Sequence, residues 1–542
     1  MIKLFAAIII VTLSTQTMAQ QKADTLVEVS ISNGKLEGAR NASTGIAIFK
    51  GIPFAQPPVG ELRWKAPQPV ANWQGTRSAH HFGNNPMQKN VFGDMLFRSS
   101  GMSEDCLYLN VWTPDANAKE KLPVLVYFYG GGFVAGDGSE SRYDGESLAR
   151  KGIVTLTVNY RLGIFGFFSH PELSAESPYH GSGNYGLLDQ QAALAWVQKN
   201  IAAFGGDPKR VTIAGESAGS IAVNAQMASP LSKNLIAGAI GESGGMIAPT
   251  LPPLPLAKAE ENGVNFSKAA GVSGLAALRA ISDTTLLNLA AKPGAFQTSA
   301  TVDGYFLPQT PAEIFAAGKQ AQVPLLAGWN STEIPYGGFM WGEAPTPENY
   351  RKRIAQQYPT DSAKVFALYP ASNEQEVIAS ATALASDRFI VYSTWKWLEL
   401  HLANSNQPVY RYVFGRPRPP MVASMGNAQS GLAGGVVRGA TPPSKLPPPM
   451  NGAAHAVEIE YALGNLAGNK VYEWTKEDYA VSATMEDYFA NFIKTGNPNG
   501  KKLPNWPVNK KGEEIWEMHI NVESKAVKEM HRERYLFLEK QY

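Results

Sequence analysis

Short, continuous apolar runs alternate along the chain with stretches of amphipathic character. Five runs that are rich in β-branched residues predict buried strands, at 123–129, 152–158, 211–214, 323–327 and 409–414. Apolar residues at helical spacing predict a helix over 187–201. Continuous apolar strands that alternate with helices are typical of an α/β protein, in which helices cover both faces of a large, mostly parallel sheet.

The strongest local motif follows the third predicted strand, where residues 215–219 read Gly-Glu-Ser-Ala-Gly. A β-branched strand leads in and small residues that favour a helix lead out, which is the context of a nucleophile elbow. Only glycine fits beside the serine in so sharp a turn, so the Ser217 hydroxyl is exposed above the sheet. We therefore predict that Ser217 is a nucleophile at the carboxyl edge of the sheet.

A serine nucleophile needs a base, and in enzymes with this elbow the acid and the histidine follow the serine in the chain. Of the eight histidines, four come after Ser217. We expect His401, in a tryptophan-rich amphipathic stretch, on a helix surface, and His519 and His531 lie in a charged C-terminal region. His455 follows the fifth strand in a loop of small residues, so it is the predicted base, with a structural loop histidine as the alternative.

The acid that orients the histidine is expected in a loop after an intervening strand. Glu333 follows the fourth predicted strand and is the candidate. Asp303 is the rival, but it precedes that strand and lies in a Val-Asp-Gly turn, where a turn role is more natural.

Three glycines at 130–132 follow the first predicted strand, with Tyr129 before them. Such a triplet presents backbone N–H groups without side-chain obstruction, as an oxyanion hole requires. The predicted donors are amides of this triplet together with the amide of Ala218. The alternative is a phosphate loop, but no Gly-Lys-Ser/Thr sequence follows the triplet.

Composition and charge restrict the classes of partner. Lys and Arg total 48 against 46 for Asp and Glu, and a net charge of +2 gives no argument for nucleic acid or an anionic membrane. The 44% of hydrophobic residues suffices for a large core, and no repeat or linker divides 20–542, so one domain is predicted. A single cysteine, Cys106, makes no disulfide within the chain. We expect no metal or organic cofactor, because the chain has no His-Glu-x-x-His motif or cysteine cluster.

Residues 1–19 have the pattern of a secretory signal peptide. Lys3 precedes an apolar run over 4–13, and a polar stretch ends at Ala19, after which cleavage is expected. A buried N-terminal helix is the alternative. No later segment is apolar and long enough to anchor the chain in a membrane. We expect a secreted or periplasmic protein that is a monomer or a weak homodimer.

Two further stretches have open roles. Residues 416–452, rich in Pro, Gly and Ala, form either a wall over the site entrance or a surface excursion. The large side chains that flank Glu333 either line a substrate pocket or pack inside the protein: Trp329, Tyr336, Phe339, Met340 and Trp341. The acyl and alcohol specificity is not readable from these patterns, and a hydroxycinnamoyl ester is one candidate among several.

Longer motifs surround these candidates. Residues 204–208 read Phe-Gly-Gly-Asp-Pro before the Gly-Glu-Ser-Ala-Gly elbow, and 104–111 read Glu-Asp-Cys-Leu-Tyr-Leu-Asn-Val. Together with 49–55, 159–163 and 183–190, they resemble the signatures of the type-B carboxylesterase/cholinesterase family over nearly the whole mature chain.

The resemblance implies an α/β-hydrolase fold with Ser217, Glu333 and His455 as the catalytic triad. It implies Gly131, Gly132 and Ala218 as the oxyanion donors. It further implies two supporting features: Ser243 next to the acid–histidine pair, with an ordinary strand-end serine as the alternative, and a structural ion pair between Arg63 and Glu104.

The chain departs from the family pattern at three places. The cysteine that commonly pairs with the one at 106 is absent from the stretch 85–88. Ile334 follows the predicted acid where the family usually has glycine. No tryptophan lies between Pro86 and Cys106, so a cation–π site for quaternary ammonium is not supported.

We predict a serine carboxylesterase that acts on a small-molecule ester through an acyl-enzyme on Ser217. Two alternatives remain. An amidase or peptidase would share the same oxyanion chemistry. A non-catalytic, cholinesterase-like binding protein would share the fold, although the intact triad argues against it.

Overall fold

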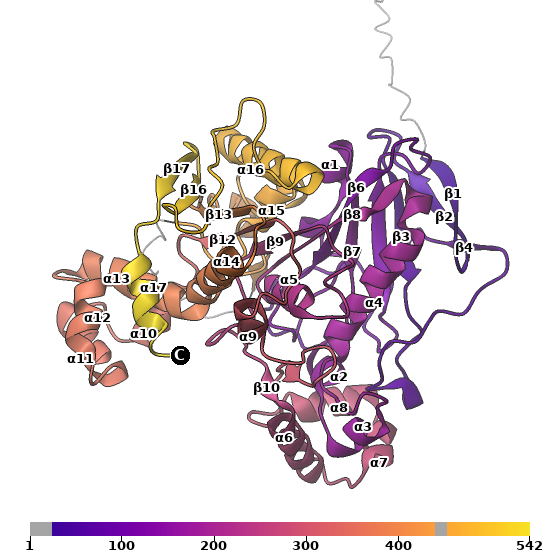
Figure 1. Ribbon diagram of the computed structural model, residues 1–542, viewed down its shortest axis with the longest axis horizontal. Helices are drawn as coiled ribbons and strands as arrows, with labels where there is room; N and C mark the ends of the chain where they lie inside the picture. The colour runs from indigo at the N-terminus through magenta and orange to yellow at the C-terminus, as the bar shows by residue number, and fades with distance from the viewer. Residues whose placement is uncertain (1–23, 439–451) are drawn as a thin grey trace, which may run out of the picture.

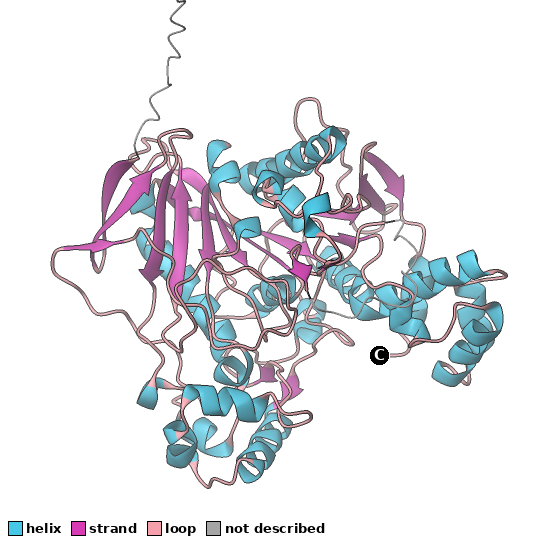
Figure 2. Ribbon diagram, turned by 180° about the vertical axis from the view of Figure 1, so that it is seen from behind, coloured by secondary structure: helices cyan, strands magenta, loops and turns pink. Residues whose placement is uncertain are grey.

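The computed structural model describes residues 24–438 and 452–542. The predicted signal peptide (1–19) and the 439–451 part of the Pro-rich stretch lie outside these residues. Within them, a thirteen-stranded sheet runs through the centre of the molecule (Figures 1 and 2). In spatial order its strands are β1 (Thr25–Ile31), β2 (Gly34–Arg40), β3 (Ala47–Pro53), β5 (Tyr108–Thr113), β7 (Val154–Val158), β6 (Leu122–Phe128), β8 (Gly206–Glu216), β9 (Gly238–Glu242), β12 (Leu325–Asn330), β13 (Val409–Phe414), β16 (Trp516–Ile520) and β17 (Lys525–Lys528), with β4 (Thr76–Ser78) beside β2.

The middle of the sheet is parallel from β7 through β6, β8, β9, β12 and β13 to β16. Antiparallel strands extend both edges. The predicted large, mostly parallel sheet is therefore confirmed, and all five strands expected from the sequence are among its parallel members. Parallel strands end at one edge of a sheet, and an α/β protein places its site at that edge.

Helices connect the strands and form two groups away from the sheet. In chain order they are α1 (Glu146–Arg150), α2 (Gly163–Phe167), α3 (Pro171–Glu176), α4 (Tyr185–Asn200), α5 (Ala218–Ala228), α6 (Leu256–Ala269), α7 (Leu275–Ala280), α8 (Asp283–Ala290), α9 (Pro311–Ala316), α10 (Gly337–Met340), α11 (Pro347–Gln357), α12 (Ser362–Leu368), α13 (Glu374–Ser386), α14 (Tyr392–Asn404), α15 (Ile459–Ala462), α16 (Lys476–Thr495) and α17 (Arg532–Leu538). One group contains α3 and α6–α8, and the other contains α10–α13 with α17 (Figure 1).

Both faces of the sheet are covered, as β9 shows. A methyl group at Gly241 would meet Trp397 of α14 and Ser220 of α5, whereas one at Gly238 would face Phe492 of α16. Residues an odd number of positions apart on a strand point to opposite faces. Helices α5 and α14 therefore cover one face and α16 the other.

The structure corrects one expectation at α14. His401 is fully buried, not on a helix surface; its Nε2 lies 3.0 Å from the Val323 carbonyl oxygen and its ring packs against Phe315 of α9. The expectation was wrong because α14 packs on the sheet and on α9 at the same time, so its polar side is covered too. Burial lowers the pKa of His401 to about 4, which keeps the imidazole neutral.

A buried ion pair ties distant segments together. Arg63 Nε donates to Glu104 Oε2 at 2.8 Å and Nη2 donates to Oε1 at 2.5 Å, as the family resemblance implied. The remaining Nη1 donates to the Ile281 carbonyl at 2.6 Å. The pair thus joins the N-terminal loops to the segment between α7 and α8. In 24–438 and 452–542, no helix has both the length and the apolar character needed to cross a bilayer.

Candidate active site

Ser217 lies at a strained turn between β8 and α5, where the elbow motif predicts it. Its backbone has φ 55° and ψ −122°, outside the regions that side chains other than glycine favour. The Ser217 amide donates to the Glu242 carbonyl at 2.8 Å, which fixes the turn. A Cβ at Gly219 would lie 2.0 Å from the Phe128 carbonyl oxygen, so this close approach requires glycine. The turn holds the hydroxyl above the edge of the sheet.

The structure brings the three predicted triad residues into contact. Ser217 Oγ lies 2.9 Å from His455 Nε2, and His455 Nδ1 lies 2.6 Å from Glu333 Oε2. The other Glu333 oxygen accepts the Asn330 amide at 2.7 Å. A carboxylate on Nδ1 keeps the proton on that nitrogen, which leaves Nε2 as the acceptor for the serine proton.

The other residues named with the predicted acid also have defined contacts. Ser243, which follows β9, donates to Glu333 Oε1 at 2.6 Å, so it lies next to the predicted acid, where the family resemblance places it. The rival Asp303 accepts the amides of Tyr305 and Leu307, which is a turn role. Ile334 replaces the usual glycine without displacing Glu333, and its amide donates to Ser386.

The glycine triplet follows β6 and borders the same cavity as Ser217. Gly131 has φ +112° and Gly132 has φ +64°, and the Gly131 carbonyl accepts the amides of Val134 and Ala135 at 3.0 and 3.1 Å. Among the bonds of the described residues, no carbonyl accepts from the amides of Gly131, Gly132 or Ala218. Three backbone donors therefore remain available beside the serine hydroxyl.

A second carboxylate, that of Glu216, faces the histidine and was not among the predicted site residues. Glu216 Oε1 lies 3.3 Å from His455 Nε2, the nitrogen that also contacts the serine. Burial opposes a charge on His455, but Glu216 and Glu333 outweigh it and raise the pKa of the imidazole. The site is therefore built to stabilise an imidazolium at this position.

Two further buried glutamates, Glu458 and Glu242, lie around the same site. Glu458 accepts from Asn330 Nδ2 at 2.5 Å, and burial followed by the Glu216 and Glu333 charges raises the pKa of Glu458 to about 8. Tyr127 donates to Glu242 at 3.1 Å, and burial raises the pKa of Glu242 well above its usual value. Burial therefore favours the protonated, uncharged form of both carboxyls.

Two of these glutamates share a pattern that is visible in the sequence. Glu216 and Glu242 each end an apolar parallel strand, and they face each other in the β8–β9 register. A carboxylate that ends a buried strand lies at the edge where sites form. Glu458 has no comparable pattern, apart from following His455 by three residues.

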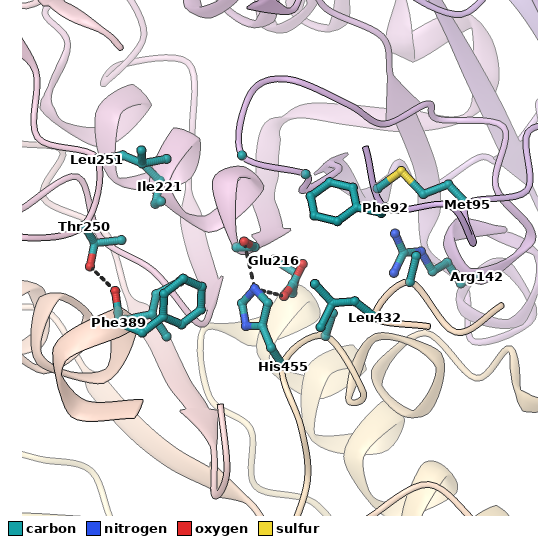
Figure 3. A pocket seen from close by; sticks show the side chains of 16 residues that line it. Phe92, Met95, Arg142, Glu216, Ile221, Thr250, Leu251, Phe389, Leu432 and His455 are labelled. Atoms are coloured by element: carbon teal, nitrogen blue, oxygen red, sulfur yellow. Dashed lines mark hydrogen bonds and ion pairs between the residues drawn. The ribbon is translucent and has the colours of Figure 1, made fainter. Parts of the chain in front are cut away.

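The cavity above Ser217 has a volume of about 280 Å³ and mostly apolar walls. Figure 3 shows Phe92 and Met95 on one side of His455 and Glu216, and Leu251 and Phe389 on the other. Leu432, from the Pro-rich stretch, also lines it, so the described part of that stretch does form a wall. Volume and lining suit a small ligand with an apolar group.

Most of the large side chains around Glu333 pack inside the protein instead of lining this cavity. Phe339 and Met340 are buried, and Trp329 packs against Tyr535. Trp341 is 73% exposed. None of them borders the cavity above Ser217, so the packing interpretation holds for the buried residues, whereas Trp341 lies on the surface.

Comparisons with known proteins identify the family of the chain. The model of the carboxylesterase family matches residues 25–538. The chain belongs to the carboxylesterase family. It is 34% identical over 512 residues to the fumonisin B1 esterase of Sphingopyxis macrogoltabida, covering 90% of this chain and 86% of that one. It is also 34% identical to the para-nitrobenzyl esterase of Bacillus subtilis, covering 88% of this chain and 92% of that one.

A solved structure of a PNB esterase superposes with a TM-score of 0.76 at 29% identity, covering 94% of this chain and 99% of that one. The predicted α/β-hydrolase fold and the predicted family are thereby confirmed. The chain is therefore an enzyme that hydrolyses carboxylic esters.

Proposed function

We propose that this carboxylesterase works through an acyl-enzyme on Ser217, with His455 as the base and Glu333 as the acid of a Ser-His-Glu triad. One observation carries the proposal. A single buried imidazole contacts the serine hydroxyl with one nitrogen and a carboxylate with the other, at 2.9 and 2.6 Å. That arrangement activates an otherwise weak nucleophile at neutral pH.

In the first half of the reaction, Ser217 Oγ attacks the ester carbonyl carbon as its proton passes to His455 Nε2. The carbonyl oxygen becomes an oxyanion, which accepts the amides of Gly131, Gly132 and Ala218. Removal of one such donor costs about 3 kcal/mol in the transition state. The intermediate collapses when the bond to the alcohol oxygen breaks, and Nε2 returns the proton to that oxygen.

In the second half, a water molecule attacks the acyl carbon of the ester bond to Ser217. His455 takes the proton from the water, the same amides hold the second oxyanion, and Ser217 leaves with the proton from Nε2. The products are the alcohol and the acid, and the serine is regenerated. Glu333 keeps the imidazole oriented throughout and stabilises its charged form.

The cavity supports esters with an apolar acyl or alcohol group. Its walls present Phe92, Met95, Leu251, Phe389 and Leu432 to the space above the serine. We propose p-nitrobenzyl and p-nitrophenyl esters as first substrates, because the relative from Bacillus subtilis is a para-nitrobenzyl esterase.

Kinetics on a matched ester and anilide separate the alternatives. We expect hydrolysis of p-nitrophenyl butyrate with an initial burst of nitrophenol, and hydrolysis of p-nitrobutyranilide at least about a thousandfold slower. The Ser217→Ala variant should lower kcat by about four to six orders of magnitude while the thermal transition is kept. Comparable rates on the anilide would favour an amidase. A folded protein that turns over neither substrate would favour a binding role.

We also propose export of the protein through residues 1–19. The support is the order of Lys3, the apolar run over 4–13 and the small residue Ala19. Mass spectrometry of the N-terminal peptide from cells that secrete the protein should find a chain that starts at Gln20. A mature chain that retains Met1 would contradict the proposal.

A further inference from the structure

A single arginine is built into the mostly apolar wall of the active-site cavity. Arg142 lies in the short helix η2 (Ser141–Tyr143), is only 6% exposed, and borders the same cavity as Ser217 and Glu216. In Figure 3 its guanidinium reaches into the view from the side of Met95, toward the side where Glu216 lies. A buried guanidinium is costly unless it is paired, so its partners show what it is there for.

Arg142 uses only one side of its guanidinium for a structural partner. Nη2 donates to Glu140 Oε1 at 3.3 Å, and Nε lies 3.2 Å from the other Glu140 oxygen. Nη1 is buried and, within the described residues, has no hydrogen-bond partner. Glu216 Oε1 is in the same situation, because its 3.3 Å approach to His455 Nε2 is its one polar contact there. Arg142 and Glu216 thus border one small cavity, and each has a buried polar atom without a hydrogen-bond partner among the described residues.

Arg142 differs from the other charged groups around Glu216. His455 and Arg142 are the cationic groups that act on it first, and Arg418 acts more weakly. Arg418 is already paired with Glu460 at 3.2 Å. The other titratable groups that interact electrostatically with the carboxylate are acids and phenols: Glu333, Glu242, Glu458, Tyr127, Tyr143, Tyr160 and Tyr412.

We propose that Arg142 is a positioning residue of the esterase, which holds Glu216 in its anionic form beside His455. The imidazolium that forms during acyl transfer then faces two carboxylates, Glu333 on Nδ1 and Glu216 near Nε2. This inference rests on the proposed function of Ser217 and His455. Burial raises the pKa of Glu216, and the positive charges of His455 and Arg142 counteract that rise. Without Arg142, one proton remains on the Glu216–His455 pair up to a higher pH. The active form, with a neutral imidazole and an anionic Glu216, is then populated only at a higher pH.

The test is the pH profile of kcat/KM on p-nitrophenyl butyrate for the Arg142→Met variant. We expect the midpoint of the acid limb to move upward by about one pH unit, since the loss of a neighbouring positive charge makes the anionic form of Glu216 less favourable. Activity at pH 6.5 then falls about tenfold, while the alkaline plateau stays within about twofold of the parent. Arg142→Lys, which restores the positive charge, should return the limb toward the parental midpoint.

A double-mutant experiment shows whether Arg142 acts on the acid limb through Glu216. In a Glu216→Gln enzyme, which has no carboxylate to protonate, Arg142→Met should move the acid limb by less than about 0.3 pH units. The control is Arg98→Met, which removes an arginine from a more exposed pair with Asp144 and should leave the limb in place. If Arg142→Met leaves Glu140 unpaired and fails to fold, the Arg142→Met/Glu140→Gln variant removes the pair as a unit.

Two results would overturn the proposal. An unchanged acid limb with a uniformly lower plateau would show that Arg142 has a structural role only. An equal shift in the Glu216→Gln background would show that Arg142 acts on His455 directly. Failure of the proposed function itself is distinct from both, because Ser217→Ala would then keep its activity.

Discussion

The most informative single change is Glu333→Gln, because the structure leaves the new amide no good orientation. Glu333 Oε1 accepts from Ser243 and from the Asn330 amide, and Oε2 faces His455 Nδ1. A glutamine that places its NH₂ at the Oε1 position opposes two donors. One that places it at the Oε2 position forces the proton of the imidazole onto Nε2, where it blocks the transfer from Ser217.

The size of the effect follows from comparable triads. In a Ser-His-Asp triad the corresponding Asp→Asn change lowers kcat by about 10⁴. Glu216 remains beside the imidazole here and still stabilises its charged form. We therefore expect kcat of Glu333→Gln to fall by about 10³ to 10⁴, which corresponds to about 4 to 5.5 kcal/mol.

The assay is kcat on p-nitrophenyl butyrate at pH 8, normalised to the folded fraction from circular dichroism. Asp303→Asn is the matched control, since that carboxylate accepts the turn amides of Tyr305 and Leu307 and has no contact with His455, and its kcat per folded enzyme should stay within about threefold of the parent. A Glu333→Gln enzyme within a few-fold of the parent, with a large loss in Asp303→Asn, would show that Asp303 is the acid.

Three further predictions follow from the same geometry. Ser243→Ala removes a hydrogen bond to a charged oxygen, worth about 1.5 to 3 kcal/mol, so kcat should fall about tenfold to a hundredfold; an unchanged kcat would make Ser243 an ordinary strand-end residue. Gly219→Ala should lower the melting temperature by several degrees in scanning fluorimetry, because its methyl group has no room, whereas Gly337→Ala meets nothing within 4 Å and should not. His455 acts as base only when neutral, and its neighbouring carboxylates raise its pKa despite burial, so the acid limb of kcat/KM should have its midpoint above the ordinary histidine value of about 6.5; a midpoint below it would contradict this electrostatic account.

The elbow and the strands were predictable because their signals are local. The five predicted strands are continuous apolar runs, and the site of Ser217 needed only a strand, a glycine-flanked serine and a helix-forming segment. Chain order then selected Glu333 and His455 from a few candidates. Ser243 and the ion pair of Arg63 with Glu104 depended on the family resemblance.

The features that were missed or wrong depend on contacts between distant segments. The unused face of Arg142 and its shared cavity with Glu216 arise where η2 meets the end of β8, and no spacing in the sequence reports that meeting. His401 looked like a surface residue because α14 is amphipathic, yet α9 covers its polar side. Phe389 lines the cavity from a π-helical turn, Asp387–Val391, that no local pattern indicates.

The central claim is that the hydroxyl at 217 is the one activated nucleophile of the esterase. Labelling with a fluorophosphonate, followed by peptide mapping, tests it most directly. We predict one adduct per chain, located on Ser217, with loss of esterase activity in proportion to labelling and no adduct in the Ser217→Ala or His455→Ala variants. An adduct on another residue in the inactivated enzyme, or full labelling of the His455→Ala variant at the parental rate, would contradict the account.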